Sequence, residues 1–299
     1  MLTVGAGIVH YRFWPAVRST VDALLGQTRP PDSIVVIENG SGDDSASAIR
    51  DAYPQVQVLE VSENRGPIVG MNLILDSFME KGVDVILLLT HETRLAPDAL
   101  ERMVSRLAED DQIGVVGPLL GYSSRPDDVW SAGGVIDPRS WETDHVQDPR
   151  RISDWAGRPP HPVGWLEGAC LLYRAEAVRQ AGRLHEEFFM MFDEPDYQLR
   201  LQSLGWRAEC VPAAVAWQEP GDKPPYIFTR NRLGFLARRA PRRVLWRALV
   251  GLCYDLARDG LRPRPGRGGR SHALLAARGL LDFLLNRWGR PPAALTGRR

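Results

Sequence analysis

Three acidic side chains within four residues are the part of this sequence best suited to chemistry. Asp193, Glu194 and Asp196 directly follow the apolar run 188–192, which we expect to be buried. A helix is predicted to begin here, because Pro195 suits a first turn and apolar residues then recur at helical spacing. One carboxylate would be enough to balance the helix dipole. Three carboxylates beside an apolar run repel one another and should raise at least one pKa, as a general base requires.

The residues around this cluster do not decide which acid is the base. Asp196 has a second interpretation, because Arg200 lies four residues further along the same helix face. The two side chains could form an ordinary stabilising ion pair without any part in chemistry. Both interpretations of Asp196 remain open at the level of the sequence.

Short β-branched runs alternate with amphipathic segments over the first 120 residues. The predicted strands are Leu2–Val9, Ser33–Ile37, Val56–Val61, Val83–Leu89 and Gly114–Pro118. The predicted helices lie near residues 12–25, 44–52, 67–80 and 97–108. Alternation of this kind predicts an α/β fold, with a mostly parallel sheet flanked by helices on both faces.

The middle of the chain is less regular. Residues 120–165 are rich in Gly, Pro, Asp, Arg and Trp, which predicts a long irregular excursion. Order then returns with a strand at Gly168–Tyr173, a short helix from Ala175, the acidic helix and a strand at Trp206–Val211. The acidic cluster is therefore expected to lie between two strands of the sheet.

The C-terminal part reads as a separate helical segment. Helices are predicted at about 226–258 and 271–288, separated by a Pro- and Gly-rich linker at 262–270. We therefore divide the chain into a catalytic domain at 1–225 and an arginine-rich helical extension at 226–299.

The net charge of zero hides a sharp division. Residues 230–299 contain seventeen arginines, no lysine and three acids, so this tail carries +14 and the remainder −14. Such asymmetry suggests different partners for the two parts. A basic amphipathic tail could lie on an anionic membrane surface, dock on the acidic body or form a homodimer contact, and the sequence leaves these open. No recognisable nucleic-acid module accompanies the charge, so no nucleic-acid partner is predicted.

The cysteines and the lengths of the apolar segments indicate the cellular compartment of the protein. Cys170, Cys210 and Cys253 are widely spaced and follow no metal or redox pattern. Residues 1–7 have neither a basic leader nor an apolar core long enough for a signal peptide, and no window approaches the ~20 apolar residues of a membrane span. We expect a cytoplasmic protein, which the basic tail could hold at the inner face of the membrane. Arginine-rich, lysine-poor usage points to a GC-rich bacterial genome.

The loops that follow the first four predicted strands form a second group of candidates. Ligands of parallel sheets bind beyond the carboxyl ends of the strands, and all four loops are polar and turn-forming. A single loop of this kind is uninformative, but four together suit a nucleotide-shaped cleft. The candidate ligand-binding residues are His10, Glu38, Asn39, Asn64, Arg65, Gly66, Asn72, Thr90 and Glu92.

Seven short motifs, taken in order, resemble the family 2 glycosyltransferases with a GT-A fold, especially rhamnosyltransferase-like members. Each motif is degenerate alone, and their order makes the match specific over about residues 1–235. The motifs are Glu38–Ser41, Asn64–Gly66 with Asn72, Leu87–Thr93, Trp130–Gly134, Trp165–Ala169, Phe188–Arg200 and Gly205–Arg207.

The resemblance implies an inverting glycosyltransferase that binds a nucleotide-diphosphate sugar of UDP or dTDP type. In that family a carboxylate at the start of the late helix deprotonates the acceptor hydroxyl, which attacks the anomeric carbon from the opposite face. By position the base corresponds to Glu194, with Asp193 beside it and Asp196 one turn further on. Glu38 resembles the acid that contacts the base or ribose of the nucleotide, although it could also cap the turn that follows.

Two departures from the family pattern concern a metal. The family usually coordinates Mn²⁺ or Mg²⁺ through an Asp-x-Asp-like motif and a later Trp-His pair. Here the first is Thr90-His91-Glu92 and the second ends in Gln218, so only Glu92 is an unambiguous hard-cation ligand. Binding of a divalent cation is therefore expected to be weakened.

Cationic side chains are expected to compensate for the weakened metal site. Arg230 and Arg232 lie on a helix that the family places near the active site, and Lys223 precedes it. Guanidinium groups make bidentate phosphate contacts and keep their charge, so they could help to stabilise the leaving diphosphate.

Two functional classes follow. The first is an inverting transferase acting on a small-molecule, lipid-linked or polymeric acceptor. The second is a non-catalytic nucleotide-sugar-binding or scaffolding relative, in which the eroded metal motif reflects lost chemistry. The intact carboxylate cluster favours the first class.

Overall fold

The computed structural model describes residues 1–261 and 269–292. Its strands are β1 Val4–His10, β2 Ser33–Asn39, β3 Gln57–Val61, β4 Val85–Thr90, β5 Arg94–Leu95, β6 Ile113–Gly121, β7 Val129–Ser131, β8 Gly134–Ile136, β9 Thr143–His145, β10 His161–Pro162, β11 Cys170–Arg174 and β12 Arg207–Trp217. Its helices are α1 Trp14–Leu25, α2 Ser45–Ala52, α3 Pro67–Lys81, α4 Ala99–Glu109, α5 Ala175–Ala181, α6 Asp193–Ser203, α7 Pro225–Arg239, α8 Arg242–Leu261 and α9 Gly269–Leu284, with 3₁₀ turns η1 Ile152–Trp155 and η2 Glu186–Phe188.

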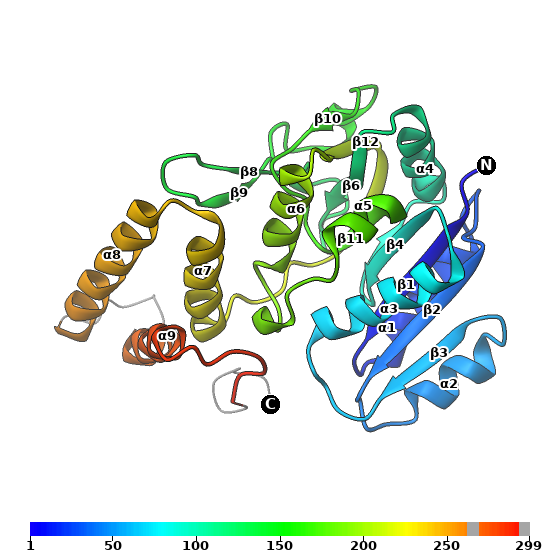
Figure 1. The fold of residues 1–299 in the computed structure, drawn as a ribbon. Coiled ribbons are helices and arrows are strands. Elements are labelled where there is room, and N and C mark those ends of the chain that lie inside the picture. Colours follow the sequence, from blue (N-terminus) through cyan, green and yellow to red (C-terminus); the bar gives the residue numbers. More distant parts are fainter. Residues whose placement is uncertain (262–268, 293–299) are drawn as a thin grey trace.

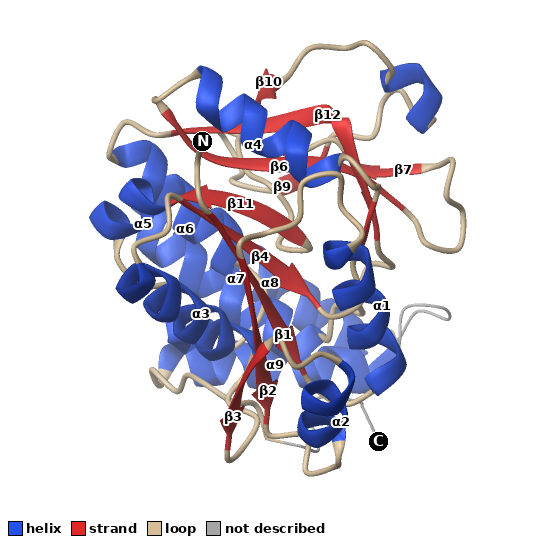
Figure 2. Cartoon of the chain, turned by 90° about the vertical axis from the view of Figure 1, so that its right-hand side faces the viewer, coloured by secondary structure: helices blue, strands red, loops and turns tan. Residues whose placement is uncertain are grey.

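One large sheet crosses the molecule in the order β10-β12-β6-β11-β4-β1-β2-β3. Strands β3, β2, β1 and β4 are parallel, β11 runs antiparallel between β4 and β6, and β12 is again parallel to β6. Helices cover both faces of this sheet, while α7, α8 and α9 lie together at one end (Figures 1 and 2). The predicted α/β fold with a mostly parallel sheet is confirmed.

The strand sequences build the two faces of the core. On β4, Ile86 and Leu88 pack with α3, whereas Val85, Leu87 and Leu89 belong to the apolar cluster with α1 and α4. Side chains of a strand alternate between faces, so a continuous apolar run is what a strand covered on both sides requires.

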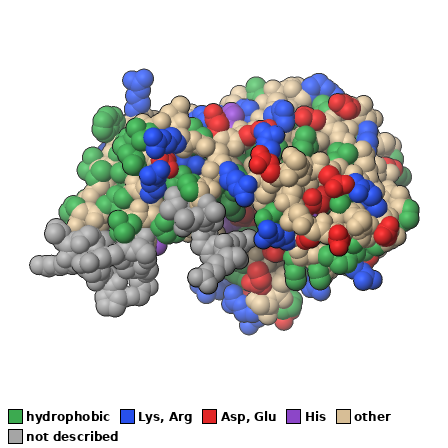
Figure 3. All heavy atoms as spheres, turned by 90° about the horizontal axis from the view of Figure 1, so that it is seen from below, with side chains coloured by type: hydrophobic (Ala, Val, Ile, Leu, Met, Phe, Trp, Pro, Cys, Tyr) green, Lys and Arg blue, Asp and Glu red, His purple; other side chains and the backbone are tan. Residues whose placement is uncertain are grey.

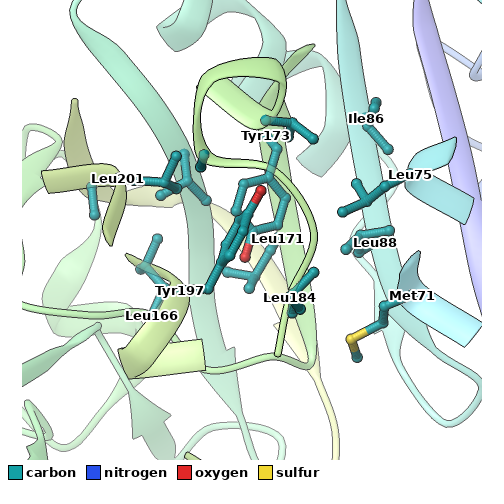
Figure 4. Close-up of a cluster of buried hydrophobic side chains, with 14 of the residues drawn as sticks. Met71, Leu75, Ile86, Leu88, Leu166, Leu171, Tyr173, Leu184, Tyr197 and Leu201 are labelled. Carbon is teal, nitrogen blue, oxygen red and sulfur yellow. The ribbon is translucent and has the colours of Figure 1, made fainter. Parts of the chain in front are cut away.

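A further part of the core lies directly beneath the acidic helix. The rings of Tyr173 on β11 and Tyr197 on α6 pack edge to face, with centroids 5.7 Å apart (Figure 4). Leu171 and Leu201 extend the same buried cluster. Burial of these side chains fixes α6 on the sheet, and with it the carboxylates of its first turn.

The tail differs from the prediction in one respect. The single helix expected at 226–258 is broken into α7 and α8, because Pro241 follows Ala240, whose backbone is extended (φ −85°, ψ 155°). Proline disfavours a helical conformation in the residue before it. The predicted linker at 262–270 lies mostly outside the described residues, and its last two residues begin α9.

The excursion at 120–165 contains only short strands and one 3₁₀ turn, in agreement with the prediction. Within the described parts of the chain, no helix has both the length and the apolar character needed to cross a membrane.

Candidate functional site

The acidic helix α6 begins after a strained loop. Phe189, Met191 and Phe192 have φ values of 66°, 68° and 65°, in the left-handed region that non-glycine residues rarely adopt. Asn231 on α7 holds this loop, because its side-chain amide donates to two backbone carbonyls of the loop at 2.6 and 2.7 Å. Strain of this kind persists only where the surrounding structure enforces it, and it clusters at functional sites.

Asp193 and Glu194 lie beside a third carboxyl group, that of Glu167 in the loop before β11. Burial, followed by the charge of Glu194, raises the pKa of Glu167 to about 8 and that of Asp193 well above its ordinary range. Burial also raises the pKa of Glu194, but backbone N–H groups and a hydrogen bond from Asp193 favour its charged form. Gly168 makes room for this arrangement, because a Cβ there would collide with the Glu194 carboxylate.

Asp196 has a different environment on the same turn. Its carboxylate is 1% exposed and accepts hydrogen bonds from Arg239 Nε at 2.6 Å and His185 Nδ1 at 2.8 Å. Burial alone would raise the pKa of Asp196, but these bonds outweigh it and hold the pKa below its ordinary value. The ion pair with Arg200, one of the two interpretations left open by the sequence, does not form, because Arg200 Nη2 donates to the backbone carbonyl of Arg183 at 2.6 Å and the Asp196 oxygens accept from Arg239 and His185.

Glu167, Ser131 and His145 lie in or next to the cluster, and sequence reasoning gave them no role. His145 Nε2 lies 3.4 Å from Glu167 Oε2, and His145 Nδ1 lies 3.0 Å from Ser131 Oγ. The charge of Lys223 lowers the pKa of both Glu167 and His145. Glu167 and Ser131 do lie inside two of the family motifs, which was the available signal. His145 comes from the irregular excursion and carries no signal of its own.

The strand-end loops contact the loop before α6. Asn39 Nδ2 donates to the carbonyl of Gly66 at 3.1 Å, and Asn64 Oδ1 accepts the N–H of Gly66 at 2.9 Å. Gly66 has a φ of 93°, and a Cβ there would lie 2.6 Å from the carbonyl oxygen of Phe189. Only glycine suits both demands, so this turn brings the ends of β2 and β3 to the strained loop.

The end of β4 reaches the same place. The N–H of Thr90 donates to the carbonyl of Ala169 at 3.2 Å, two residues beyond Glu167. Thr90 Oγ1 and Thr93 Oγ1 each lie 2.7 Å from Gln218 Oε1. The two positions where the sequence departs from the family pattern therefore meet in one hydrogen-bonded group of neutral side chains.

Among the described residues around Glu92 and Gln218, the structure shows no clear binding group for a divalent cation. Glu92 supplies one carboxylate, which is 53% exposed and lies 3.6 Å from His91 Nε2. The amide oxygen of Gln218 is already engaged by two hydroxyls. Within residues 1–261 and 269–292, no three His, Cys, Asp or Glu side chains gather closely enough to hold a metal ion. Mg²⁺ and Mn²⁺ prefer several oxygen ligands, so this donor set is poor.

His10 is fully buried at the end of β1, and neither ring nitrogen has a hydrogen-bond partner. Burial, with a smaller effect from His91, lowers the pKa of His10 to about 4, so its imidazole is neutral near pH 7. Glu38 Oε1 accepts the N–H of Ser41 at 2.7 Å, which is the turn-capping alternative. The amide oxygen of Asn39 is likewise buried without a partner. Unpaired buried polar atoms are costly, and a bound ligand can satisfy them.

Two predicted ligand-binding residues are used elsewhere. Asn72 exchanges hydrogen bonds with the backbone of Leu184 at 2.9 and 3.0 Å, which fastens α3 to the segment before η2. Arg230 is 1% exposed, and its guanidinium donates to the carbonyls of Phe188 and Gly289 at 3.3 and 3.0 Å. A buried arginine must satisfy its donors locally, so the predicted phosphate contact of Arg230 is corrected.

Other cationic side chains remain accessible. Arg65 is about half exposed and lies 3.9 Å from Glu186, while Arg232 lies 3.5 Å from Glu142. Lys223 is exposed and acts electrostatically on the carboxylate cluster. A surface hollow of about 510 Å³ lies between β8 and β10 and is lined by residues such as Trp155 and His161 rather than by the carboxylates.

A mostly parallel sheet with a carboxylate cluster on a later helix is the arrangement expected of a GT-A fold. The chain belongs to the family described as "Glycosyltransferase like family 2", whose model matches residues 7–244. An N-acetylglucosaminyl-diphospho-decaprenol L-rhamnosyltransferase of Mycobacterium tuberculosis is 26% identical over 228 residues, which cover 69% of this chain and 72% of that protein. The resemblance drawn from the sequence is thereby confirmed.

Solved structures agree on the fold. The mannosyltransferase PcManGT of Pyrobaculum calidifontis, in complex with GDP-Man and Mn²⁺, superposes with a TM-score of 0.59 at 16% identity and covers 96% of this chain and 88% of its own. GalNAc-T7 with UDP, GalNAc and Mn²⁺ gives a TM-score of 0.60 at 15% identity over 80% of this chain. This match spans half of the GalNAc-T7 chain.

Proposed function

We propose that this glycosyltransferase inverts the anomeric centre by direct displacement, with Glu194 as the general base. The arrangement of three carboxyl groups supports this choice. Asp193 and Glu167 have the pKa values most favourable to a bound proton, whereas Glu194 receives the hydrogen bonds that favour its charge. The cluster then carries its single negative charge at Glu194, which stands ready to accept a proton at neutral pH.

The step is a single displacement. Glu194 removes the proton of an acceptor hydroxyl while that oxygen attacks the anomeric carbon. The bond from this carbon to the diphosphate oxygen breaks, and the nucleoside diphosphate leaves with the electron pair. Asp196 takes no part, because its carboxylate is occupied by Arg239 and His185.

The donor we propose is a uridine or thymidine diphosphate sugar in the cleft at the strand ends. His10 and Asn39 place unpaired polar atoms there, and Arg65 keeps an exposed guanidinium beside the start of α3. Neutral imidazole and amide groups suit the polar edge of a nucleobase, and the guanidinium suits phosphate. GDP-Man and UDP are the ligands in the similar structures.

We also propose that transfer depends little on a divalent cation. The neutral Thr90–Thr93–Gln218 group occupies the place of the expected ligands, and Lys223, Arg65 and Arg232 supply positive charge in its stead. Activity should therefore fall by less than about tenfold in excess EDTA, the equivalent of one ordinary interaction. Complete loss in EDTA with full recovery on adding Mn²⁺ would contradict this.

A lipid-linked sugar is the acceptor class we propose, with the extension at 226–299 resting on an anionic membrane. The relative from Mycobacterium tuberculosis is named for a decaprenol-linked substrate. On α8, Trp246, Val250 and Tyr254 form a stripe at spacing i, i+4, i+8, and each is 66% exposed. Apolar and basic side chains gather at this end of the molecule (Figure 3). A helix with an apolar stripe and arginines suits an anionic lipid surface.

The described part of the tail also docks on the body, through α7 rather than α8. Arg238 pairs with Glu187, and Arg239 pairs with Asp196. Flotation with vesicles of phosphatidylglycerol and phosphatidylcholine tests the membrane proposal. Trp246→Glu should abolish flotation, whereas Leu204→Glu, on an exposed leucine of the body, should not. Equal flotation of both variants, or conversion of a dimer to a monomer by Trp246→Glu, would contradict it.

The main test compares Glu194→Gln with Glu80→Gln, a matched change on the exposed face of α3. Glu194→Gln should lower kcat by roughly 10²–10⁴-fold, while thermal shifts show that donor binding is retained. Glu80→Gln should change neither. Product with retained anomeric configuration would refute the displacement. Full activity of Glu194→Gln would show that Glu194 is not the general base.

A further inference from the structure

The hydrogen bonds around His145 fix the direction in which its protons point. Ser131 Oγ lies 3.0 Å from the carbonyl oxygen of Gly133, and only the hydroxyl can donate in that contact. The hydroxyl proton is then used, so the 3.0 Å contact between Ser131 Oγ and His145 Nδ1 needs Nδ1 as donor. A neutral His145 protonated on Nδ1 has a lone pair on Nε2. That lone pair faces Glu167 Oε2 at 3.4 Å.

Two tryptophan rings pack against the ring of His145. Trp130 and Trp165 lie against it, with ring centroids at 5.9 and 4.9 Å. Burial and the positive charge of Lys223 lower the pKa of His145 to about 4, against a smaller opposite effect of Asp144. His145 is therefore neutral near pH 7, and its Nε2 accepts a proton in a hydrogen bond rather than donating one.

Glu167 is enclosed by charged and titratable groups from several elements. Glu194 and Asp193 face it from α6, His145 faces it from β9, and Lys223 acts on it from the segment before α7. The negative charge of Glu194 makes a second negative charge on Glu167 costly. The lone pair of His145 offers a partner only to the protonated form of Glu167.

We propose that His145 and Glu167 are positioning residues for this reaction: His145 accepts a hydrogen bond from Glu167, keeps it a neutral carboxylic acid and so leaves the negative charge of the cluster on Glu194. This rests on the proposed role of Glu194. The pKa of about 8 for Glu167 and that of about 4 for His145 agree with it. Ionisation of Glu167 would place a second negative charge beside the base and near the path of an anionic diphosphate donor.

Glu167→Gln is the decisive variant, since an amide can donate to His145 Nε2 but cannot ionise. At pH 7 its kcat/KM should fall by no more than about tenfold, the effect of one altered hydrogen bond. The kcat/KM of the unmodified protein should decline above a pH of about 8, by about tenfold per pH unit, whereas that of Glu167→Gln should not. A loss of 10²-fold or more at pH 7, as for Glu194→Gln, would overturn the proposal.

His145 provides the companion test. His145→Ala lets water solvate Glu167, so the alkaline decline in kcat/KM should move about one pH unit lower. His145→Gln keeps an acceptor oxygen and should restore the original position. An unchanged decline in His145→Ala would overturn the role of His145.

A readout that needs no substrate separates this proposal from the proposed function. If Glu167 keeps its proton in the folded state, the Tm of the unmodified protein should fall relative to that of Glu167→Gln between pH 5 and 8. Parallel Tm curves would show that Glu167 is ionised and would overturn the proposal. If the relative fall in Tm is observed but no donor supports transfer, the proposed reaction is wrong and the protonation state of Glu167 stands.

Discussion

The first turn of α6 presents two acidic sites with opposite electrostatics. Asp193 and Glu194 face Glu167, and burial raises the pKa of each of these carboxyl groups. Asp196, in the same turn, is buried as deeply but accepts hydrogen bonds from Arg239 and His185, and its pKa is lowered. Two sites within one helical turn therefore differ in the partners that other elements bring to them.

We propose that this difference separates a catalytic carboxylate from a structural one. A carboxylate with bound cations is stable and unreactive, because accepting a proton would break its ion pairs. A carboxylate surrounded by other acids is costly to maintain, but it binds a proton readily when the acceptor offers one. Cations at Asp196 and acids at Glu194 thus divide the roles within the turn.

The largest effect that would sharpen this comparison is on folding. Asp196→Ala removes two hydrogen bonds to a buried charge, from Arg239 and His185, so the free energy of unfolding should fall by about 3–5 kcal/mol. Chemical denaturation measures the fall. The double variant Asp196→Ala, Arg239→Met should recover part of it. If Asp196→Ala keeps its stability but loses turnover, Asp196 belongs to the chemistry and the division fails.

The effect of changing Asp193 should appear in kcat rather than in stability. Asp193→Ala removes the donor that favours the charged form of Glu194, so kcat should fall about 10–100-fold, the value of a hydrogen bond to a charged group. Asp193→Asn can still donate and should fall by about tenfold or less. Steady-state kinetics at pH 7 on both variants decide this. A larger loss of kcat in Asp193→Asn than in Asp193→Ala would show that Asp193 acts as an anion.

How far the sequence predicts this site depends on the kind of contact. Local patterns placed the first four strands, their helices and the start of α6, because burial on both sheet faces demands continuous apolar runs. The same patterns placed Asp193, Glu194 and Asp196 in one first turn. These features are set by neighbours along the chain.

Long-range contacts explain what was missed. His145 meets Glu167 across 22 residues of irregular chain, and Arg239 reaches Asp196 across 43 residues. Nothing near Asp196 in sequence announces Arg239, whereas Arg200 at i+4 is the natural local guess. Arg230 was misplaced for a similar reason, since its carbonyl partners at Phe188 and Gly289 belong to distant segments.

The two neighbouring aspartates should also give opposite pH dependences of stability. The pKa of Asp196 is below its ordinary value of 3.8 in the folded state, so its contribution is present above that pH and lost as the pH falls further. The pKa of Asp193 is raised, so its contribution is present below pH 3.8 and lost as the pH rises.

Matched variants test these signs. Asp196→Asn should flatten the acid limb of a plot of Tm against pH, and Asp193→Asn should flatten the decline toward neutral pH. Each effect should amount to several degrees, since about 1 kcal/mol shifts Tm by roughly 2–4 °C in a domain of this size. Two variants that change the same limb would erase the distinction between the two sites.

The smallest expected effect concerns Arg200, the partner that local spacing favours for Asp196. Its Nη2 donates to the carbonyl of Arg183, and its guanidinium lies over the ring of Tyr197 with 4.9 Å to the centroid. Arg200→Ala should therefore cost about 1 kcal/mol or less, far below the cost of Arg239→Ala, and should leave the acid limb of Tm unchanged. Denaturation of the two alanine variants side by side measures this. Equal losses of stability in the two variants would mean that Arg200, on the same helix, stabilises Asp196 as much as Arg239 on α7 does.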